Sequence, residues 1–129
     1  MRLTQSNLIE NALIADVANI AQSGTYNTGS NINEIYIGGS DYVDIQMKVT
    51  GEAAANGVVT FNWLLTNDNT SYPTVASFQS VITMTSNTIT KEGKQYFIGG
   101  YKYMKLLSIT NGDAAKDATA VNALVSSIG

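Results

Sequence analysis

Apolar and polar residues alternate along three segments of the chain, residues 41–50, 58–66 and 75–85. Successive side chains of a β-strand point to opposite faces, so this period of two predicts strands with one buried face. Trp63 falls on such a face, and we therefore place it in the core rather than on the surface as a platform for sugars. The apolar faces consist of Val43, Ile45, Met47 and Val49, of Val59, Phe61, Trp63 and Leu65, and of Ala76, Phe78, Ile82 and Met84 with Ser80 among them.

Turn-forming residues separate these segments. GEAAANG ends in Asn56-Gly57, a pair that favours positive φ angles, so we expect residues 41–50 and 58–66 to form an antiparallel hairpin. NDNTSYP, SNTITKEGK and NGDAAKD are further turns, and ATAVNALVSSI (residues 118–128) is a final strand. Strands separated by polar turns predict an all-β, antiparallel, jelly-roll-like β-sandwich of about 7–8 strands in one domain, residues 1–129. We find no internal repeat or linker.

The first 23 residues fit two structures. A short helix is predicted by the nearly helical spacing of four apolar residues and a preceding capping-box pattern; these residues are Ile9, Leu13, Val17 and Ile20, with Asn7 and Glu10 before them. The segment ALIADVANIA (residues 12–21) also fits a strand or extended arm. We favour the strand, because a sandwich needs a partner for its edge.

Residues 96–113, YFIGGYKYMKLLSITNGD, combine aromatic, basic and apolar side chains. We expect one long strand that begins near Gln95, with a bulge or bend at Gly99-Gly100. By parity, one face carries Tyr101, Tyr103, Lys105, Leu107 and Ile109, and the other carries Lys102, Met104, Leu106 and Ser108.

A strand with apolar residues on both faces must be covered on both faces. The second sheet covers one face, and either the N-terminal segment of the same chain or a neighbouring subunit covers the other. We favour the subunit, with Tyr101 and Tyr103 as anchors and Lys105 at the wet rim. The complete set of interface candidates is Tyr101, Tyr103, Lys105, Leu107, Tyr42, Leu13 and Val17.

Several kinds of catalytic and metal site are excluded by composition. The chain has neither His nor Cys, and therefore no Ser-His-Asp triad, no Cys-His pair and no zinc site of the usual ligands. We expect no enzyme, no cofactor and no metal. The oxygen-rich stretches TNDNTS and NGDAAKD, the latter with Asp113 and Asp117, are interpreted as capped turns rather than calcium loops. SGTYNTGSN (residues 23–31) lacks the end of a phosphate loop and is interpreted as a surface connection.

Charge and polarity bear on partners and location. The net charge of −3 argues against nucleic acid, and only 13% of residues are charged. Abundant Thr, Asn and Ser give a neutral, hydrogen-bonding surface that suits assembly. Glu10 and Asp16 interrupt the apolar N-terminal segment, so we expect no secretion signal. Residues 69–90 are uncharged but too polar to span a membrane, and we expect a soluble protein made in a cytoplasm.

The order of segments resembles that of a known class of proteins. ALIADVANIAQSGTYNTGS leads into VDIQMKVTG, VVTFNWLLTNDN follows, and YKYMKLLSITNGDA precedes VNALVSSIG. This order is similar to that of the small β-sandwich virion proteins of tailed bacteriophages, which are head decoration, cement or minor structural components. The resemblance implies a homo-oligomer, with a trimer favoured, seated on a lattice of the major capsid protein at the virion surface after synthesis in the host cytoplasm. It implies no site residues, because no site motif matches.

Two other functions remain as alternatives. Tyr26, Tyr36, Tyr42 and Tyr72 fall at loop or outward positions, and exposed tyrosines mark protein interfaces and ligand grooves alike. A carbohydrate-binding module for adsorption to cell-surface glycans would use Tyr42, Tyr72 or Tyr101 to stack on sugars. A tail or adaptor component is the third hypothesis.

Overall fold

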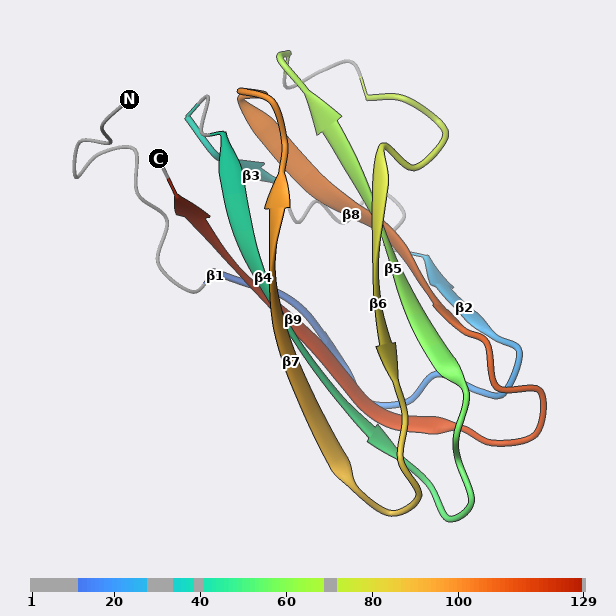
Figure 1. Cartoon of the computed structure of the whole chain (residues 1–129). Coiled ribbons are helices and arrows are strands. Elements are labelled where there is room, and N and C mark those ends of the chain that lie inside the picture. The colour runs from blue at the N-terminus through green and yellow to red at the C-terminus, as the bar shows by residue number, and fades with distance from the viewer. Residues whose placement is uncertain (1–11, 28–33, 39–40, 69–71, 129) are drawn as a thin grey trace.

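The computed structural model describes residues 12–27, 34–38, 41–68 and 72–128, and only the backbone of residues 12–15 and 127–128. Within these residues the chain forms nine strands, slightly more than expected, because two of them are short (Figure 1). The strands are β1 (Ala12–Val17), β2 (Thr25–Asn27), β3 (Ile35–Tyr36), β4 (Tyr42–Gly51), β5 (Val58–Thr66), β6 (Phe78–Thr83), β7 (Ile89–Phe97), β8 (Tyr103–Asn111) and β9 (Ala118–Ile128). No helix in this part of the chain has the length and hydropathy needed to cross a membrane.

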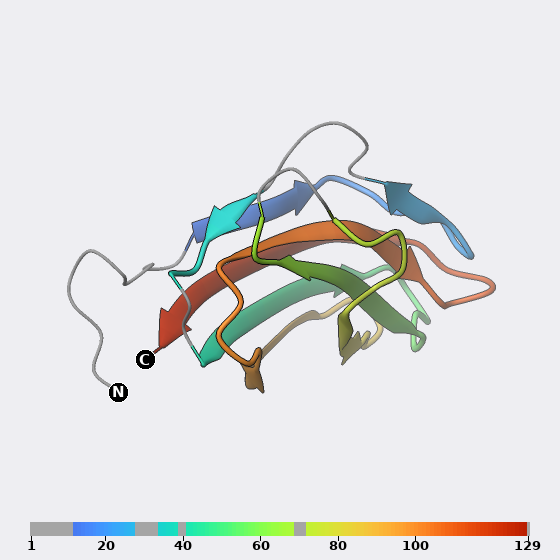
Figure 2. The same ribbon diagram turned by 90° about the horizontal axis from the view of Figure 1, so that it is seen from above.

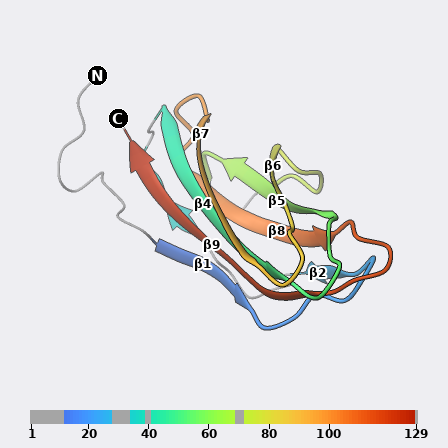
Figure 3. The same cartoon turned by 60° about the horizontal axis from the view of Figure 1, so that its bottom comes forward.

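The strands form two antiparallel sheets that pack face to face. Sheet A has the order β1-β9-β4-β7, which can be followed in Figure 3. Sheet B has the order β2-β8-β5-β6, and β3 also pairs with β8. The chain passes repeatedly from one sheet to the other, which gives the interleaved Greek keys of a jelly roll. The predicted fold class is confirmed, and so is the strand at residues 12–17, which pairs with β9 at the edge of sheet A.

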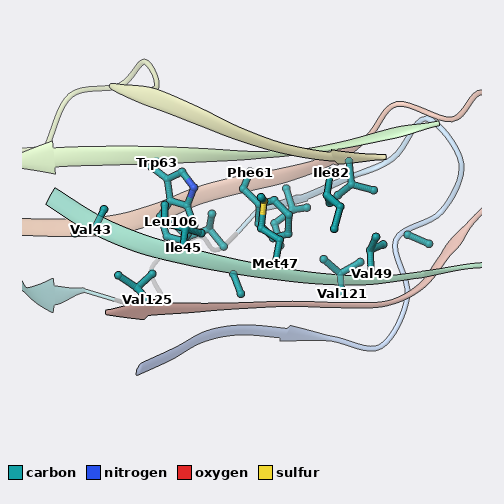
Figure 4. Close-up of a cluster of buried hydrophobic side chains, with 14 of the residues drawn as sticks. Val43, Ile45, Met47, Val49, Phe61, Trp63, Ile82, Leu106, Val121 and Val125 are labelled. Atoms are coloured by element: carbon teal, nitrogen blue, oxygen red, sulfur yellow. The ribbon is translucent and has the colours of Figure 1, made fainter. Parts of the chain in front are cut away.

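The core lies between the sheets and consists of the predicted inward faces (Figure 4). The fully buried aromatic side chains, Phe61 and Trp63, both come from sheet B. Trp63 is fully buried, as predicted, and its indole N–H donates to Ser80 Oγ over 2.8 Å. The residues drawn and labelled in the core are Val43, Ile45, Met47, Val49, Phe61, Trp63, Ile82, Leu106, Val121 and Val125.

The predicted hairpin between residues 41–50 and 58–66 is wrong. β4 pairs with β7 and β9, whereas β5 pairs with β6 and β8. The two strands lie in different sheets and face one another across the core. One-sided apolar patterns are the same for strands that pair edge to edge and for strands that pack face to face, so the pattern could not separate the two arrangements.

The expected turn at residues 86–94 is also wrong over most of its length. β7 begins at Ile89 and forms an edge of sheet A, and most of its side chains are exposed. An edge strand that carries charged residues and exposes both faces has no apolar alternation to reveal it. The bend predicted at Gly99-Gly100 does exist, with φ of 67° and 79°. It ends β7 and carries the chain across to sheet B, so residues 96–113 do not form one strand.

β8 contains a bulge that changes which side chains face the core. Ser108 pairs with Asn62 and Leu106 pairs with Trp63, which leaves Leu107 as the extra residue. The parity of the strand reverses there, and Ile109 is fully buried. The prediction that Ile109 shares a face with Tyr103 and Lys105 is therefore wrong.

In the stretch interpreted as a surface connection, residues 25–27 instead form β2 against β8.

Asp113 holds together the loops at one end of the sandwich. One of its carboxylate oxygens accepts the backbone N–H groups of Asn56 and Gly57, both over 3.0 Å. The other accepts those of Ala115 and Lys116, over 2.9 and 3.0 Å. These bonds, that from Ala115 most of all, lower the pKa of Asp113 because they favour the carboxylate. The capped turn predicted here is confirmed at Asp113.

Two further residues complete this end. The buried Asn111 donates to the carbonyl oxygens of Ile20 and Lys116, over 3.1 and 2.9 Å, and so ties the link after β1 to the loop before β9. Gly57 permits the close approach of the loops, because a Cβ at this position would lie 2.6 Å from the Cα of Asp113.

Candidate functional site

Two links cross between the sheets side by side at the opposite end of the sandwich. One joins β3 to β4 and the other joins β7 to β8 (Figures 1 and 2). The backbone N–H of Ile37 donates to the carbonyl oxygen of Lys102 over 2.6 Å. Reciprocally, the N–H of Ile98 donates to the carbonyl oxygen of Asp41 over 2.8 Å. Both isoleucines are also buried, so they anchor the described ends of the two links.

The two links share one sequence pattern. Residues 36–42 are YIGGSDY and residues 97–103 are FIGGYKY, so each has an aromatic residue, Ile-Gly-Gly, two variable residues and Tyr. The first glycines of the two copies, Gly38 and Gly99, have nearly equal φ angles of 64° and 67°. The expectation that the chain has no internal repeat is therefore wrong at this short length.

Aromatic rings pair across the two copies of this pattern. Tyr36 packs edge to face on Tyr103, with ring centroids 5.2 Å apart. Tyr42 packs in the same way on Phe97, at 5.4 Å. The first aromatic residue of each copy thus meets the last tyrosine of the other copy, which makes the arrangement locally two-fold. We call Tyr36, Tyr42, Phe97, Tyr101 and Tyr103 the aromatic end.

The aromatic end is exposed to a degree that is unusual for such residues. Phe97 is 69% exposed and Tyr36 is 51% exposed. Among the described residues, four of the eight exposed large hydrophobic side chains belong to this group. Exposed aromatic side chains that pair with one another are typical of interaction sites.

The outer face of sheet B continues from the aromatic end. Lys105 Nζ lies 4.5 Å from the centroid of the Tyr72 ring, a cation–π contact. The Tyr72 hydroxyl donates to Glu34 Oε2 over 2.7 Å. Burial, followed by the hydrogen bond and charge of Glu34, raises the pKa of Tyr72 far above its usual value.

A hollow of about 390 Å³ lies on this face of sheet B, between Leu107 and Tyr72. Residues 72–74 of the same chain thus cover part of this face, a cover that sequence reasoning did not consider.

The structure groups some of the predicted interface residues and separates others. Tyr42, Tyr101 and Tyr103 belong to the aromatic end, and Lys105 and Leu107 follow on the same strand. Leu13 and Val17 lie on β1 at the edge of sheet A. Val17 packs against the core, whereas the side chain of Leu13 is outside the described residues.

Sequence reasoning named Tyr36 only among the outward tyrosines, not among the interface candidates, and it did not name Phe97. Tyr36 lies in a two-residue strand, and Phe97 ends β7, of which residues 89–94 were interpreted as part of a turn. The signal that could have identified both residues is the repeated aromatic-Ile-Gly-Gly pattern. Within the described residues, no group of three or more Asp or Glu side chains is placed to hold a metal ion.

No protein-family model matches this sequence, and no curated protein matches it. Its fold is similar to that of solved structures. A chain of the IBDV viral particle is 11% identical over 95% of this chain, with a TM-score of 0.51, and this chain spans 31% of that one. A carbohydrate-binding module described as CBM4 is 11% identical over 84% of this chain and 67% of its own, with a TM-score of 0.47. The PRD1 vertex protein is 12% identical over 95% and 94% of the two chains, with a TM-score of 0.46. At 11% identity, the likeness to the chain of the IBDV viral particle indicates a shared fold and no more.

Proposed function

We propose that this protein is a virion structural subunit, a capsid decoration or cement protein that acts by binding copies of itself and a capsid lattice. The observation that carries the proposal is the aromatic end, where large side chains stand exposed on two firmly tied links. The low content of charged residues supports the same role, because a surface with few charges gives little electrostatic repulsion between subunits. A virion location also agrees with the occurrence of this fold in a chain of the IBDV viral particle.

We propose that assembly through the aromatic end gives a ring rather than a two-fold dimer. The Tyr42–Phe97 pair belongs to sheet A, and the Tyr36–Tyr103 pair begins the face of sheet B that Lys105 continues. Contact between one pair and the other pair of the next subunit would be heterologous, and a heterologous contact that closes makes a ring. The trimer implied by the resemblance is the smallest such ring. A stable contact of ordinary size would remove about 1,600 Å² from water.

Substitution of Phe97 by Ser tests the proposal. Phe97→Ser removes the most exposed ring of the aromatic end while leaving the core intact, so we expect the subunit dissociation constant to rise about tenfold or more. The unfolding midpoint of the subunit should change little. The matched control is Ile89→Ser, which alters a 56% exposed side chain at the other end of the same strand. Equal weakening by both variants, or no weakening by Phe97→Ser, would contradict the proposal.

Tyr103→Ala provides a second test in the same assay. Tyr103 is half-buried, so this variant should lower the stability of the oligomer more than the stability of the folded subunit. Equal loss of both would assign Tyr103 to the core instead of the interface. Sedimentation with purified capsids then separates a head protein from a tail or adaptor component, since only the head protein should bind the shell.

Adsorption to a cell-surface glycan is the second candidate function. Tyr42 is 40% exposed on a sheet face that also carries a groove lined by amide and lysine side chains. Tyr72 is a weaker candidate for stacking on sugars than it was from sequence, because Lys105 already lies over its ring. Binding of neutral and charged oligosaccharides on a glycan array tests this function, and no signal above background would remove it.

A further inference from the structure

The outer face of sheet A carries a groove that lies away from the aromatic end. It has a volume of about 450 Å³ and crosses β9, β4 and β7. That volume falls in the range of roughly 300–1,000 Å³ typical of small-ligand sites. Lys48 in the groove is six residues from Tyr42 on the same strand, or about 20 Å along it. The residues that line it are Gln46, Met47, Lys48, Lys91, Glu92, Gly93, Asn122 and Leu124.

Two lysines stand next to each other in this groove. Lys48 of β4 and Lys91 of β7 are direct partners in the antiparallel register, and like charges in that position repel. The nearest acidic residue in sequence, Glu92, alternates to the other face of β7. Its charge adds to burial in raising the pKa of the half-buried Tyr96, which has the same parity on β7.

Other acidic residues of sheet A are set back from the two ammonium groups. Asp16 on β1 is separated from Lys48 by Asn122 of the intervening strand, as the registers of the strands require. Asp44 is four residues from Lys48, about 13 Å along β4. The groove therefore brings two lysines together, with Glu92 as the one acidic residue among those that line it, in a protein of net charge −3.

Neutral groups complete the lining. Gln46 and Asn122 flank the lysines on the same face, and their amides can donate to and accept from hydroxyl groups. Leu124 supplies an apolar surface beside them. Gly93, the register partner of Gln46, has no side chain to fill the space, and a Cβ there would lie only 3.5 Å from Gln46 Cγ.

We propose that this groove binds a saccharide that carries an acidic group. The carboxylate or phosphate lies between Lys48 and Lys91, where it relieves their repulsion and accepts charge-assisted hydrogen bonds. Gln46 and Asn122 bind the hydroxyl groups, and Leu124 contacts the apolar side of the sugar ring. The proposal does not depend on assembly through the aromatic end, since the two features use different residues.

The test uses the purified full-length chain and a panel of matched oligosaccharides. The panel contains uronic-acid, sialic-acid and phosphosugar oligomers, each with a neutral counterpart such as the methyl ester. We expect at least one acidic member to bind and its neutral counterpart to bind about tenfold more weakly or not at all. The acidic oligosaccharide that binds more tightly than its neutral counterpart shows whether a carboxylate or a phosphate is preferred. Inorganic sulfate is titrated in parallel as a probe of charge alone.

Charge-matched variants locate the site. Lys48→Gln and Lys91→Gln should each weaken binding of the acidic member about tenfold. Lys94→Gln is the control, because it changes the net charge equally on the same exposed strand but belongs to the opposite face. Four outcomes would overturn the proposal: no binding across the panel, equal binding of acidic and neutral members, sulfate competing as well as the sugar, or an equal effect of Lys94→Gln.

A failure to bind acidic saccharides would not contradict the proposed assembly. Light scattering on the same samples reports the oligomeric state, so a protein that assembles and binds no acidic saccharide overturns the groove proposal alone.

Discussion

Trp63 and Ser80 form a buried polar contact whose two sides come from neighbouring strands. Both residues lie on the predicted inward faces, and both are at most 1% exposed. The alternation of apolar residues therefore predicted their burial, including that of the serine. It could not predict that the serine is placed to accept the indole N–H, because this depends on the register of β5 against β6.

Ser80→Ala should lower the free energy of unfolding by about 1–3 kcal/mol, because it leaves the buried Trp63 N–H without its acceptor. Urea denaturation followed by fluorescence measures this directly, since Trp63 is the single tryptophan of the chain. Val81→Ala alters the next residue, which is 47% exposed, and should change stability by less than about 0.5 kcal/mol. A Ser80→Ala effect no larger than this control would show that another group satisfies the indole.

Asp113 makes stability depend on pH. Its pKa is lowered in the folded protein, so its contribution is complete above the unfolded value of about 4 and is lost as the pH falls through the folded pKa. Asp113→Asn should therefore lower the unfolding midpoint near neutral pH and flatten the loss of stability in acid. Denaturation curves across the acid range check this.

The control for Asp113 is Asp44→Asn, a change of the same kind in the middle of β4. It should leave the unfolding midpoint near neutral pH nearly unchanged. If Asp113→Asn lost stability in acid as steeply as the wild-type protein does, the Asp113 carboxylate would not be the group responsible for that loss.

At the scale of elements, the sequence predicts best the strands that bury one face. β4, β5, β6 and β9 lie where the alternation placed them, and β9 has the predicted bounds. β7 was missed because it exposes both faces, and the inward face of β8 was assigned wrongly beyond Leu107 because a bulge leaves no mark in the apolar pattern. The pairing of strands was not available from the pattern, as the incorrect hairpin demonstrates.

Gly99→Ala tests the link between β7 and β8. A non-glycine residue at φ of 67° is strained, so the substitution should lower the free energy of unfolding by about 1–2 kcal/mol. Space is not the limiting factor, because a Cβ would lie 3.6 Å from the Phe97 ring. Gly93→Ala, at a position without positive φ, should be neutral or stabilise by up to about 1 kcal/mol. Equal effects of both variants would mean that the positive φ does not limit this position.

At the scale of the whole molecule, the jelly roll places two links with the same pattern at one end. The sequence contains both copies, yet their meaning depends on the topology, which sets them side by side and pairs Tyr36 with Tyr103 and Tyr42 with Phe97. Tyr42, Tyr101 and Tyr103 could be proposed as contact residues from their aromatic character alone. Their grouping could not, because it joins residues more than 50 positions apart.

The groove on sheet A is a second grouping of residues that could not be predicted from the sequence. Its lysines are 43 residues apart in the sequence and become neighbours only through the pairing of β4 with β7. The aromatic end and the groove occupy separate parts of the molecule, so one subunit has room for both a protein contact and a saccharide.

The mass of the purified protein in solution tests the central claim most directly. Assembly through the aromatic end predicts that static light scattering gives a multiple of the 13.7 kDa chain, three times that mass for the favoured ring, and that Phe97→Ser shifts the mass toward the single chain. A wild-type protein that remains at 13.7 kDa up to high concentration and does not bind capsids would contradict it.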